Sequence, residues 1–291
     1  MHSNNENSAE IFSSSNHELS LLLETIRLQS GIDFSHYRRS MLTRRISARM
    51  ATLGHKDIRQ YHRSLIDNRT ECDLLVDAIA INVSSFFRDK IVYGLLEKEI
   101  LPELIERKQS SKTLAIRAWS AGCAAGEEPY SLAILLQERL KRRIDPWELF
   151  LFGTDIDQKS LQRAATALYP RERLEQTPLG IVDRYFAAEG DEFRLNDTTR
   201  AMIHFSHNDL TSAQTAAPGA SIFGDFDLVF CRNLLIYFDL DLQALVLKKL
   251  IQTLAPGGYL ILGEAETPHA LPDNGLKVID RRHRIYQKIL T

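Results

Sequence analysis

The sequence has few cysteines and no long apolar run, and each scarcity excludes a class of protein. Cys72, Cys123 and Cys231 are odd in number and widely spaced, which suits neither a disulfide framework nor a CxxC zinc site. No segment approaches the roughly 18 apolar residues of a membrane span. The first sixteen residues have neither the basic start nor the apolar stretch of a signal peptide. We therefore expect a cytoplasmic protein with no bound metal ion and no membrane insertion.

An excess of charge of either sign is also absent. The 291 residues include 36 Lys and Arg against 38 Asp and Glu, which gives a formal net charge of −2. That balance argues against a polycation that coats nucleic acid. The hydrophobic fraction of 44% and the charged fraction of 25% are those of globular proteins. The length suits about two domains of roughly 150 residues each.

The first part of the chain predicts a small all-helical domain. Residues 1–15 are rich in Ser and Asn and predict a disordered tail. Over residues 16–80, apolar side chains recur at spacings of three and four in four segments, and Asn16 and Asp57 are the expected N-caps of two of them. Residues 81–112 then predict a linker and a connecting helix.

Residues 113–291 predict an α/β domain with a parallel sheet. Four short apolar segments, LAIRAW, LFLFGTDI, FDLVFC and GGYLILG, alternate with helical segments, and this alternation is typical of such a sheet. The last segments, LKVID and HRIYQKIL, predict an antiparallel hairpin at the sheet edge. Residues 170–206 break the alternation with the short pieces RYFA, EFRL and MIHF, and they predict an inserted antiparallel β-subdomain.

The loop after the first strand, AWSAGCAAGEEPYS, has the small residues that let a ligand approach the backbone. It is neither a GxGxxG nor a P-loop motif, since Gly122 and Gly126 are four apart and no GK[ST] follows. Glu127 and Glu128 stand where a phosphate would need the helix N-terminus free of negative charge, so the loop favours an ammonium or hydroxyl group. An ordinary strand–helix connection remains the alternative.

The second strand ends in GTDID. An acid at this position is the usual means of binding a ribose diol, and Asp155 is the candidate. Asp157 is better placed to cap the next helix. Together with the preceding loop, Asp155 indicates a nucleoside-binding site.

Two further segments carry polar residues where a cleft is expected. In INVSSFFRD, Arg88 is a candidate for binding an anion, although Phe86 and Phe87 suit a packed domain junction equally well. In FDLVFCRNLLIYFD, Arg232 and Asn233 follow a buried strand, at the end where the crevice of an α/β sheet lies. A satisfied polar pair at a strand end is the alternative there.

The second predicted helix is rich in arginine. Five arginines lie between residues 38 and 49 with no acidic residue among them, and residues 20–64 hold nine basic side chains against three acidic ones. Such a face attracts an acidic protein surface or a nucleic acid. A solvated charged face is the alternative.

Five motifs in order, NVSSFFRD, WSAGCAAGEEPYSLAI, FGTDID, FDLVFCRNLLIYFD and LAPGGYLILGEAE, resemble those of the CheR-type chemotaxis methyltransferases. Members of that family methylate glutamate side chains of chemoreceptors and use S-adenosylmethionine. The resemblance covers about residues 17–290. It implies an all-helical N-terminal domain and a Rossmann-like α/β methyltransferase domain with a small inserted β-subdomain. It also implies a receptor as partner, and we expect a monomer.

The resemblance also implies roles for individual residues. Arg88 and Tyr237 would stand near the transferred methyl group, and Ser84 replaces a Thr that the family often has, which keeps the hydroxyl group. The arginines expected to dock the receptor are Arg38, Arg45 and Arg49. The loop AAEGDE is short, which predicts that the chain does not bind a receptor's C-terminal pentapeptide. The residues implied to bind the cofactor are Asn82, Ser84, Arg88, Ala121, Glu127, Asp155, Asn208, Asp209, Arg232 and Asn233.

Two other functions remain open at this point. A nucleic-acid methyltransferase would use the basic helix to bind phosphates, but the strand end CRNLLIYF lacks the [DNS]PP[YF] pattern of enzymes that methylate amino groups of bases. A non-catalytic module that binds the cofactor and docks on a partner is the other alternative. The presence of Arg88 and Tyr237 argues against it.

Overall fold

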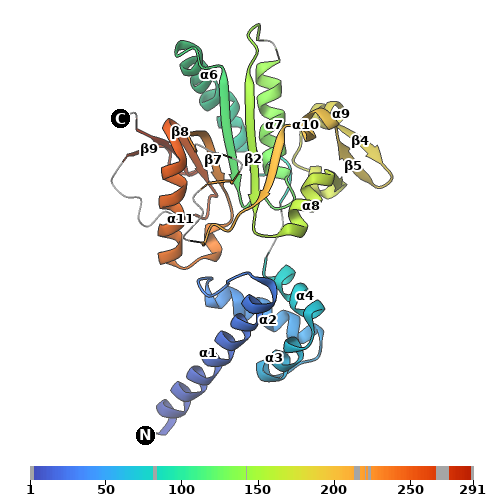
Figure 1. The fold of residues 1–291 in the computed structure, drawn as a ribbon, viewed down its shortest axis with the longest axis vertical. Helices are drawn as coiled ribbons and strands as arrows, with labels where there is room; N and C mark the ends of the chain where they lie inside the picture. The colour runs from blue at the N-terminus through green and yellow to red at the C-terminus, as the bar shows by residue number, and fades with distance from the viewer. Residues whose placement is uncertain are drawn as a thin grey trace. The chain divides into compact units, whose positions relative to one another are not determined.

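The computed structural model divides the chain into two compact units. One contains residues 1–81 and Tyr237–Asp239 and is called the helical unit; the other contains residues 82–236 and 240–291 and is called the α/β unit. The positions of the two units relative to one another are not determined (Figure 1). The residues that the structure describes are 3–80, 84–141, 143–212, 217–219, 221, 224–266 and 275–289.

Residues 3–80, the described first part of the helical unit, form four helices. They are α1 (Ser3–Ser30), α2 (Arg39–Thr52), α3 (Ile58–Ile66) and α4 (Arg69–Ile79). The first helix begins at Ser3, whereas the sequence predicted a tail up to residue 15. Neither Gly nor Pro occurs between Ser3 and Ser30, so no residue there breaks a helix.

Polar side chains cap two of these helices. Asp57 accepts a hydrogen bond from the Arg59 amide at the start of α3, which confirms the predicted cap. Asn68 accepts one from the Glu71 amide at the start of α4. The interior of the unit is apolar, with Leu22, Ile26 and Leu42 fully buried.

The segment Tyr237–Asp239 is distant in sequence but completes the helical unit. The Arg38 amide donates to the Tyr237 carbonyl (2.8 Å), and the Asp239 amide donates to the His36 carbonyl (2.9 Å). The rings of Tyr37 and Phe238 meet edge to face with centroids 5.0 Å apart. Because Phe238 is almost completely buried, this short segment is part of the core of the unit.

The α/β unit is built on a seven-stranded sheet in the order β6-β2-β1-β7-β8-β10-β9. The first five strands of that order run parallel, and β10 and β9 form the predicted antiparallel edge hairpin. This confirms the Rossmann-like α/β fold. The strands are β1 (Ala115–Ala121), β2 (Glu148–Asp155), β6 (Ile203–His207), β7 (Phe226–Cys231), β8 (Leu254–Leu262), β9 (Leu276–Asp280) and β10 (Ile285–Lys288).

Helices cover both faces of this sheet. Crossovers between parallel strands are right-handed, so α7 and α8 lie on one face, and α11, whose connection runs in the opposite direction along the sheet, lies on the other. Figure 1 shows α11 in the foreground of the sheet. A helical segment with one π-helical turn precedes β1. The helices are α5 (Lys90–Leu95), the π-turn η1 (Leu96–Ile100), α6 (Leu101–Ser110), α7 (Glu127–Leu140), α8 (Gln158–Thr166), α10 (Asp197–Arg200) and α11 (Leu240–Thr253).

The inserted subdomain differs in extent from the prediction of residues 170–206. Its sheet has the order β3-β5-β4, and it lies on the opposite side of the α/β unit from β9 (Figure 1). The MIHF segment was predicted to belong to it, but this segment forms β6 and pairs with β2 in the main sheet. A short alternating segment does not specify which sheet it joins. The elements of the insertion are β3 (Leu168–Pro170), the 3-10 helix η2 (Arg171–Leu174), α9 (Leu179–Tyr185), β4 (Phe186–Glu189) and β5 (Glu192–Leu195).

A buried ion pair makes a testable contribution to the helical unit. Glu71 accepts hydrogen bonds from Nε and Nη2 of Arg49 (2.8 and 2.6 Å) and from the Tyr61 hydroxyl (2.7 Å). Replacing Glu71 by Ala leaves these donors unsatisfied and should lower the free energy of unfolding by about 2 kcal/mol. Urea unfolding measures this. Glu24→Ala is the matched control, since it breaks an exposed pair with Arg27 and should not move the midpoint.

Candidate active site

The strand order places a crevice between β1 and β7. From β1 the chain continues to β2 on one side, and from β7 it continues to β8 on the other, so the connections diverge at this point. Ligands of open α/β sheets bind at such a point, outside the carboxyl ends of the strands. Ala121 lies beside Thr154 of β2 at this edge, and Cys231 lies beside Leu262 of β8. Ala121 is therefore at the predicted edge.

The loop after β1 approaches its neighbours closely. Gly126 has φ of +92°, and a Cβ atom there would lie 2.9 Å from the Ala164 Cβ. Gly122 has φ of +76°, and a Cβ atom would lie 2.9 Å from Leu234. Both positions need glycine, for conformation and for space. The small-residue pattern of the motif thus allows the loop to pass between α8 and the turn after β7.

Asp155 ends β2 and anchors this loop. One carboxylate oxygen accepts from the Ala124 amide and the other from the Asp157 amide, both at 2.9 Å. Burial raises the pKa of Asp155, and these amides act against the rise. Asp155 thus lies where the sequence predicted, beside the loop. Asp157 accepts from the Lys159 amide and caps α8, as predicted.

Glu127 is the least satisfied carboxylate of the site. Its side chain is 1% exposed, and neither oxygen accepts a hydrogen bond from a described residue. The Arg173 Nε lies 3.8 Å from one oxygen, beyond hydrogen-bond distance. Burial raises the pKa of this carboxyl. Because a buried carboxylate is stable only when it is compensated, Glu127 favours a cationic ligand.

Glu128, next in sequence, is already compensated. It accepts from the Ser120 hydroxyl at 2.7 Å, and one Arg232 nitrogen lies 3.9 Å from its other oxygen. Burial raises its pKa as well. Of the two acids that begin α7, Glu127 is therefore the one left for a ligand.

The segment 84–89 is held from several sides. The Phe87 amide donates to the Ser131 hydroxyl of α7 (2.9 Å) and the Phe86 amide to the Arg173 carbonyl (2.9 Å). Arg232 donates to the Arg88 carbonyl (3.0 Å) and to Asp89 (3.1 Å). Arg232 was predicted to line the adenosyl pocket, and the contacts described here are to this segment. Asn82, which was predicted to bind the cofactor, lies outside the described residues.

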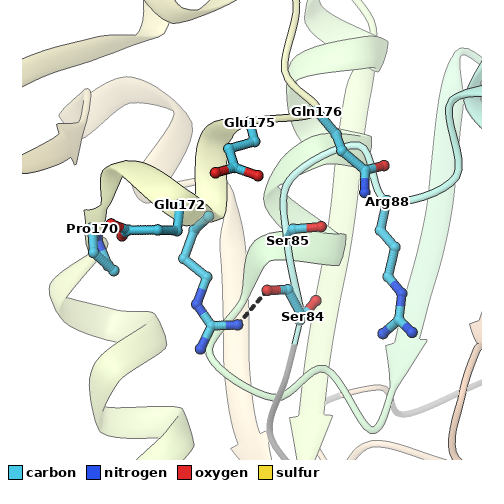
Figure 2. Close-up of a pocket in the computed structure, with 8 residues that line it drawn as sticks. Ser84, Ser85, Arg88, Pro170, Glu172, Glu175 and Gln176 are labelled. Carbon is cyan, nitrogen blue, oxygen red and sulfur yellow. Dashed lines mark hydrogen bonds between the residues drawn. The ribbon is translucent and has the colours of Figure 1, made fainter.

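A cavity of about 580 Å³ lies between this segment and the inserted subdomain. Figure 2 shows Ser84, Ser85 and Arg88 on one wall, and its dashed line is the hydrogen bond from Arg173 to the Ser84 carbonyl. The Arg88 guanidinium points away from Glu172 and Glu175 (Figure 2). The structure thus brings the predicted residues Ser84 and Arg88 to one cavity. The lining residues are Ser84, Ser85, Arg88, Pro170, Glu172, Arg173, Glu175 and Gln176.

Four of the eight described non-glycine residues with positive φ lie around this crevice. Phe87, Asp89, Ala124 and Asn233 all have positive φ (52°, 70°, 49° and 61°) without being glycine. Such conformations persist only where the surrounding contacts enforce them, and they concentrate at functional sites. All four lie in the segments that carry the predicted cofactor residues.

Glu266 holds the turn after β7, and sequence reasoning missed it. It is 3% exposed and accepts from the Leu234 and Leu235 amides, both at 2.7 Å, and from the Gly263 amide. Burial raises the pKa of Glu266, and the hydrogen bonds from these amides lower it. Glu266 thereby fixes the turn that contains Asn233. The signal available was its place at the end of the motif LAPGGYLILGEAE.

Asn208 and Asp209 follow β6 beside Asp155. The backbone amide of Asn208 donates to the Asp155 carbonyl (3.1 Å), and the side-chain nitrogen of Asn208 donates to the Ala217 carbonyl (3.1 Å). Its side-chain oxygen is buried and accepts no hydrogen bond from a described residue. That oxygen can accept from a ligand's amino group. Asp209 accepts from the amide and hydroxyl of Thr211, so it shapes the loop.

The arginines predicted to dock a partner are largely engaged within the helical unit. Arg49 forms the bidentate pair with Glu71, and the half-buried Arg45 donates to the Ala78 carbonyl at 3.5 Å. Arg38 donates to the Phe238 carbonyl at 3.0 Å. Arg45 and Arg49 are half-buried, whereas Arg38, at the N-cap of α2, is exposed. The docking role of all three arginines stays a prediction. Arg44 is also exposed.

Tyr237 belongs to the helical unit, and its distance from Arg88 is not determined. Its backbone carbonyl accepts from Arg38. Its predicted position beside the transferred methyl group therefore stays a prediction.

Comparison with known proteins identifies the family. The model described as the CheR methyltransferase SAM-binding domain matches residues 82–282, and that of the CheR methyltransferase all-alpha domain matches residues 17–80. The chain belongs to the CheR methyltransferase family. Its cofactor is S-adenosylmethionine, and the two matched domains correspond closely to the two structural units.

Three relatives illustrate the similarity. A chemotaxis protein methyltransferase of Borreliella burgdorferi is 30% identical over 86% of this chain and 88% of its own length. Chemotaxis protein methyltransferase 2 of Pseudomonas aeruginosa is 32% identical over 81% of each chain. An uncharacterized 104.1 kDa protein of Rhodobacter capsulatus is 31% identical over 93% of this chain, which spans 27% of that protein.

The residues of the crevice fit S-adenosylmethionine. The buried Glu127 carboxylate accepts no hydrogen bond from a described residue, so it can accept one from the ammonium of the methionine part. The side-chain oxygen of Asn208 can likewise accept a hydrogen bond from the adenine amino group. Asp155 lies at the strand end that binds ribose in this kind of fold.

The assignment of Asp155 is testable. Asp155→Ala should weaken binding of S-adenosylmethionine by about 1.5–3 kcal/mol, because the ribose loses a charged acceptor and the loop loses its anchor. Isothermal titration calorimetry measures this. Asp157→Ala is the control: it removes the cap of α8 and should lower stability while leaving affinity nearly intact. Equal affinity of Asp155→Ala and the unchanged protein would contradict the assignment.

Proposed function

We propose that this chain transfers the methyl group of S-adenosylmethionine to glutamate side chains of methyl-accepting chemotaxis receptors. The products are a glutamate methyl ester and S-adenosylhomocysteine. The observation that carries the proposal is the buried Glu127, which lies 3.8 Å from Arg173, a residue that lines one cavity with Ser84 and Arg88. The relatives of the chain are named chemotaxis protein methyltransferases. We further propose that the chain acts in the cytoplasm, as a monomer.

The chemistry suits a carboxylate acceptor. S-adenosylmethionine supplies a methyl group activated by a positively charged sulfonium. A glutamate with a pKa near its ordinary value of about 4.3 is ionised at neutral pH, so the site needs no general base. What the protein must supply is alignment of the carboxylate with the methyl group and exclusion of water from the crevice.

We assign the alignment to Arg88 and Tyr237. Arg88 lines the cavity and carries a permanent positive charge, which can hold one oxygen of the acceptor. Tyr237 offers a hydroxyl group. Binding one oxygen leaves the other free as the nucleophile, whereas pairing both would reduce its reactivity.

Two alternatives have less support. A nucleic-acid methyltransferase would need a broad basic face for phosphates, and internal contacts of Arg49 with Glu71 and of Arg38 with the Phe238 carbonyl reduce that face. A non-catalytic cofactor-binding module would not need Arg88 at the cavity.

The test is transfer of a labelled methyl group. Incubation with membranes that contain the host's chemoreceptors should place label on receptors, and mild base should release it as methanol, as for an ester. Arg88→Ala and Tyr237→Phe should depress turnover at least tenfold more than they weaken cofactor binding. Label that resists base would contradict glutamate esters, and unchanged turnover in both variants would contradict the assigned site.

We also propose that the exposed side of α2 recognises the receptor. Methylated receptor regions present glutamates, and Arg44 offers an exposed charge of the opposite sign. The insertion contributes no tether in this proposal, since β4 and β5 are joined by the tight turn Gly190–Asp191.

Charge reversal tests this docking surface. Arg44→Glu should raise KM for the receptor several-fold and reduce its dependence on salt, because exposed charges act within a Debye length of about 8 Å. Cofactor affinity should not change, because the matched cofactor domain is the other unit. Arg63→Glu on α3 is the control for a general change of charge. Wild-type KM in Arg44→Glu would contradict the proposal.

A further inference from the structure

The 3-10 helix η2 of the inserted subdomain reaches the cofactor site through Arg173. Its guanidinium donates to the Ser84 carbonyl, and its own carbonyl accepts from the Phe86 amide at 2.9 Å. Gln176, just beyond η2, accepts from the Asp89 amide at 3.1 Å. One residue of the insertion therefore binds the backbone of the cofactor segment on both sides of Ser85.

Aromatic packing stabilises the contact between the inserted subdomain and the 84–89 segment. Phe86 is fully buried, and its ring meets the edges of Tyr169 (4.8 Å) and Phe186 (5.0 Å), both from the insertion. The Tyr169 hydroxyl donates to the Ala125 carbonyl in the loop before α7 (2.7 Å). This packing holds the backbone of the insertion against the 84–89 segment and the loop before α7, and the hydrogen bond to Ser84 then directs the Arg173 side chain.

Arg173 is also the cation nearest to Glu127. Its Nε lies 3.8 Å from a Glu127 oxygen, and the only other cation that acts on this carboxyl among the described residues is Arg163 of α8. Cys123 and Tyr169 face it too, and burial raises the pKa of both groups far enough to keep them neutral. Arg173 is therefore the closest positive charge that favours the ionised form of Glu127, in addition to the backbone amide of Glu127 itself.

We propose that Arg173 is a positioning residue that keeps Glu127 ionised and so ready to bind the ammonium of the cofactor. This rests on the proposed role of Glu127. At 3.8 Å, Arg173 is close enough to stabilise the carboxylate electrostatically and too distant to occupy it with a hydrogen bond. Its own hydrogen bond goes to Ser84, which leaves the Glu127 oxygens to the ligand.

The sign of the pH effect follows from this arrangement. Burial raises the pKa of Glu127, and its own backbone amide, Arg173 and Arg163 lower it. Ligand binding that needs ionised Glu127 is lost as pH falls through that pKa. Without Arg173 the pKa lies higher, so the loss should begin at higher pH, while affinity well above the pKa should stay nearly the same.

The experiment is titration of the full chain with S-adenosylhomocysteine, which carries the same ammonium, from pH 5 to 7.5. Arg173→Gln should move the midpoint of the affinity profile up by about one pH unit, and Arg173→Lys should restore the wild-type profile. Arg171→Gln is the matched control, since Arg171 lies on the same turn but stacks on the Phe193 ring. It should leave the profile unchanged.

Glu127→Gln separates this inference from the proposed function. It should bind weakly at every pH, and adding Arg173→Gln should then change nothing. Wild-type affinity in Glu127→Gln would refute the role of Glu127 itself. If Glu127 does bind the ammonium, two results for Arg173→Gln would overturn the inference. One is an affinity profile identical to that of the wild type. The other is an affinity reduced equally at all pH values, which would indicate that Arg173 acts through packing alone.

Discussion

Carboxylates buried at the carboxyl edge of the sheet constrain the whole α/β unit. A buried charge is tolerated only when hydrogen bonds or an opposite charge compensate it. Asp155 and Glu266 are compensated by backbone amides, and each thereby fixes a loop. Glu128 is compensated by Ser120 and Arg232. Glu127 accepts no hydrogen bond from a described residue, and in our proposal it binds the ammonium of the cofactor.

The same constraint explains why the site draws on distant segments. Each segment contributes either a carboxylate or the group that compensates one. The carboxylates come from the end of β2, the start of α7 and the segment before α5, and the compensating groups include Arg232 after β7 and Arg173 of the inserted subdomain. Backbone strain at Phe87, Asp89, Ala124 and Asn233 is kept by this mutual support. The insertion is therefore a wall of the cavity that Ser84 and Arg88 line, as well as a separate small sheet.

The sequence predicted much of this arrangement, because local signals coincide with it. Apolar segments of strand length, caps such as Asp57 and Asp157, and the position of Asp155 are all local features. What escaped prediction depends on pairing across the chain. The MIHF segment joins β2, Arg49 pairs with Glu71, and Arg173 and Glu266 reach the site from elsewhere. Neither the periodicity nor the composition of a segment indicates which distant residue its side chains or strands will contact.

The membership of Tyr237–Asp239 in the helical unit bears on how the chain folds as it is synthesised. The four helices leave the ribosome first, yet Phe238, which belongs to their core, follows only after most of the α/β unit has been made. Until then, Tyr37 lacks its ring partner and the His36 carbonyl and Arg38 amide lack their hydrogen bonds. The N-terminal unit should thus reach its native packing late, and its nascent form should be a substrate for chaperones.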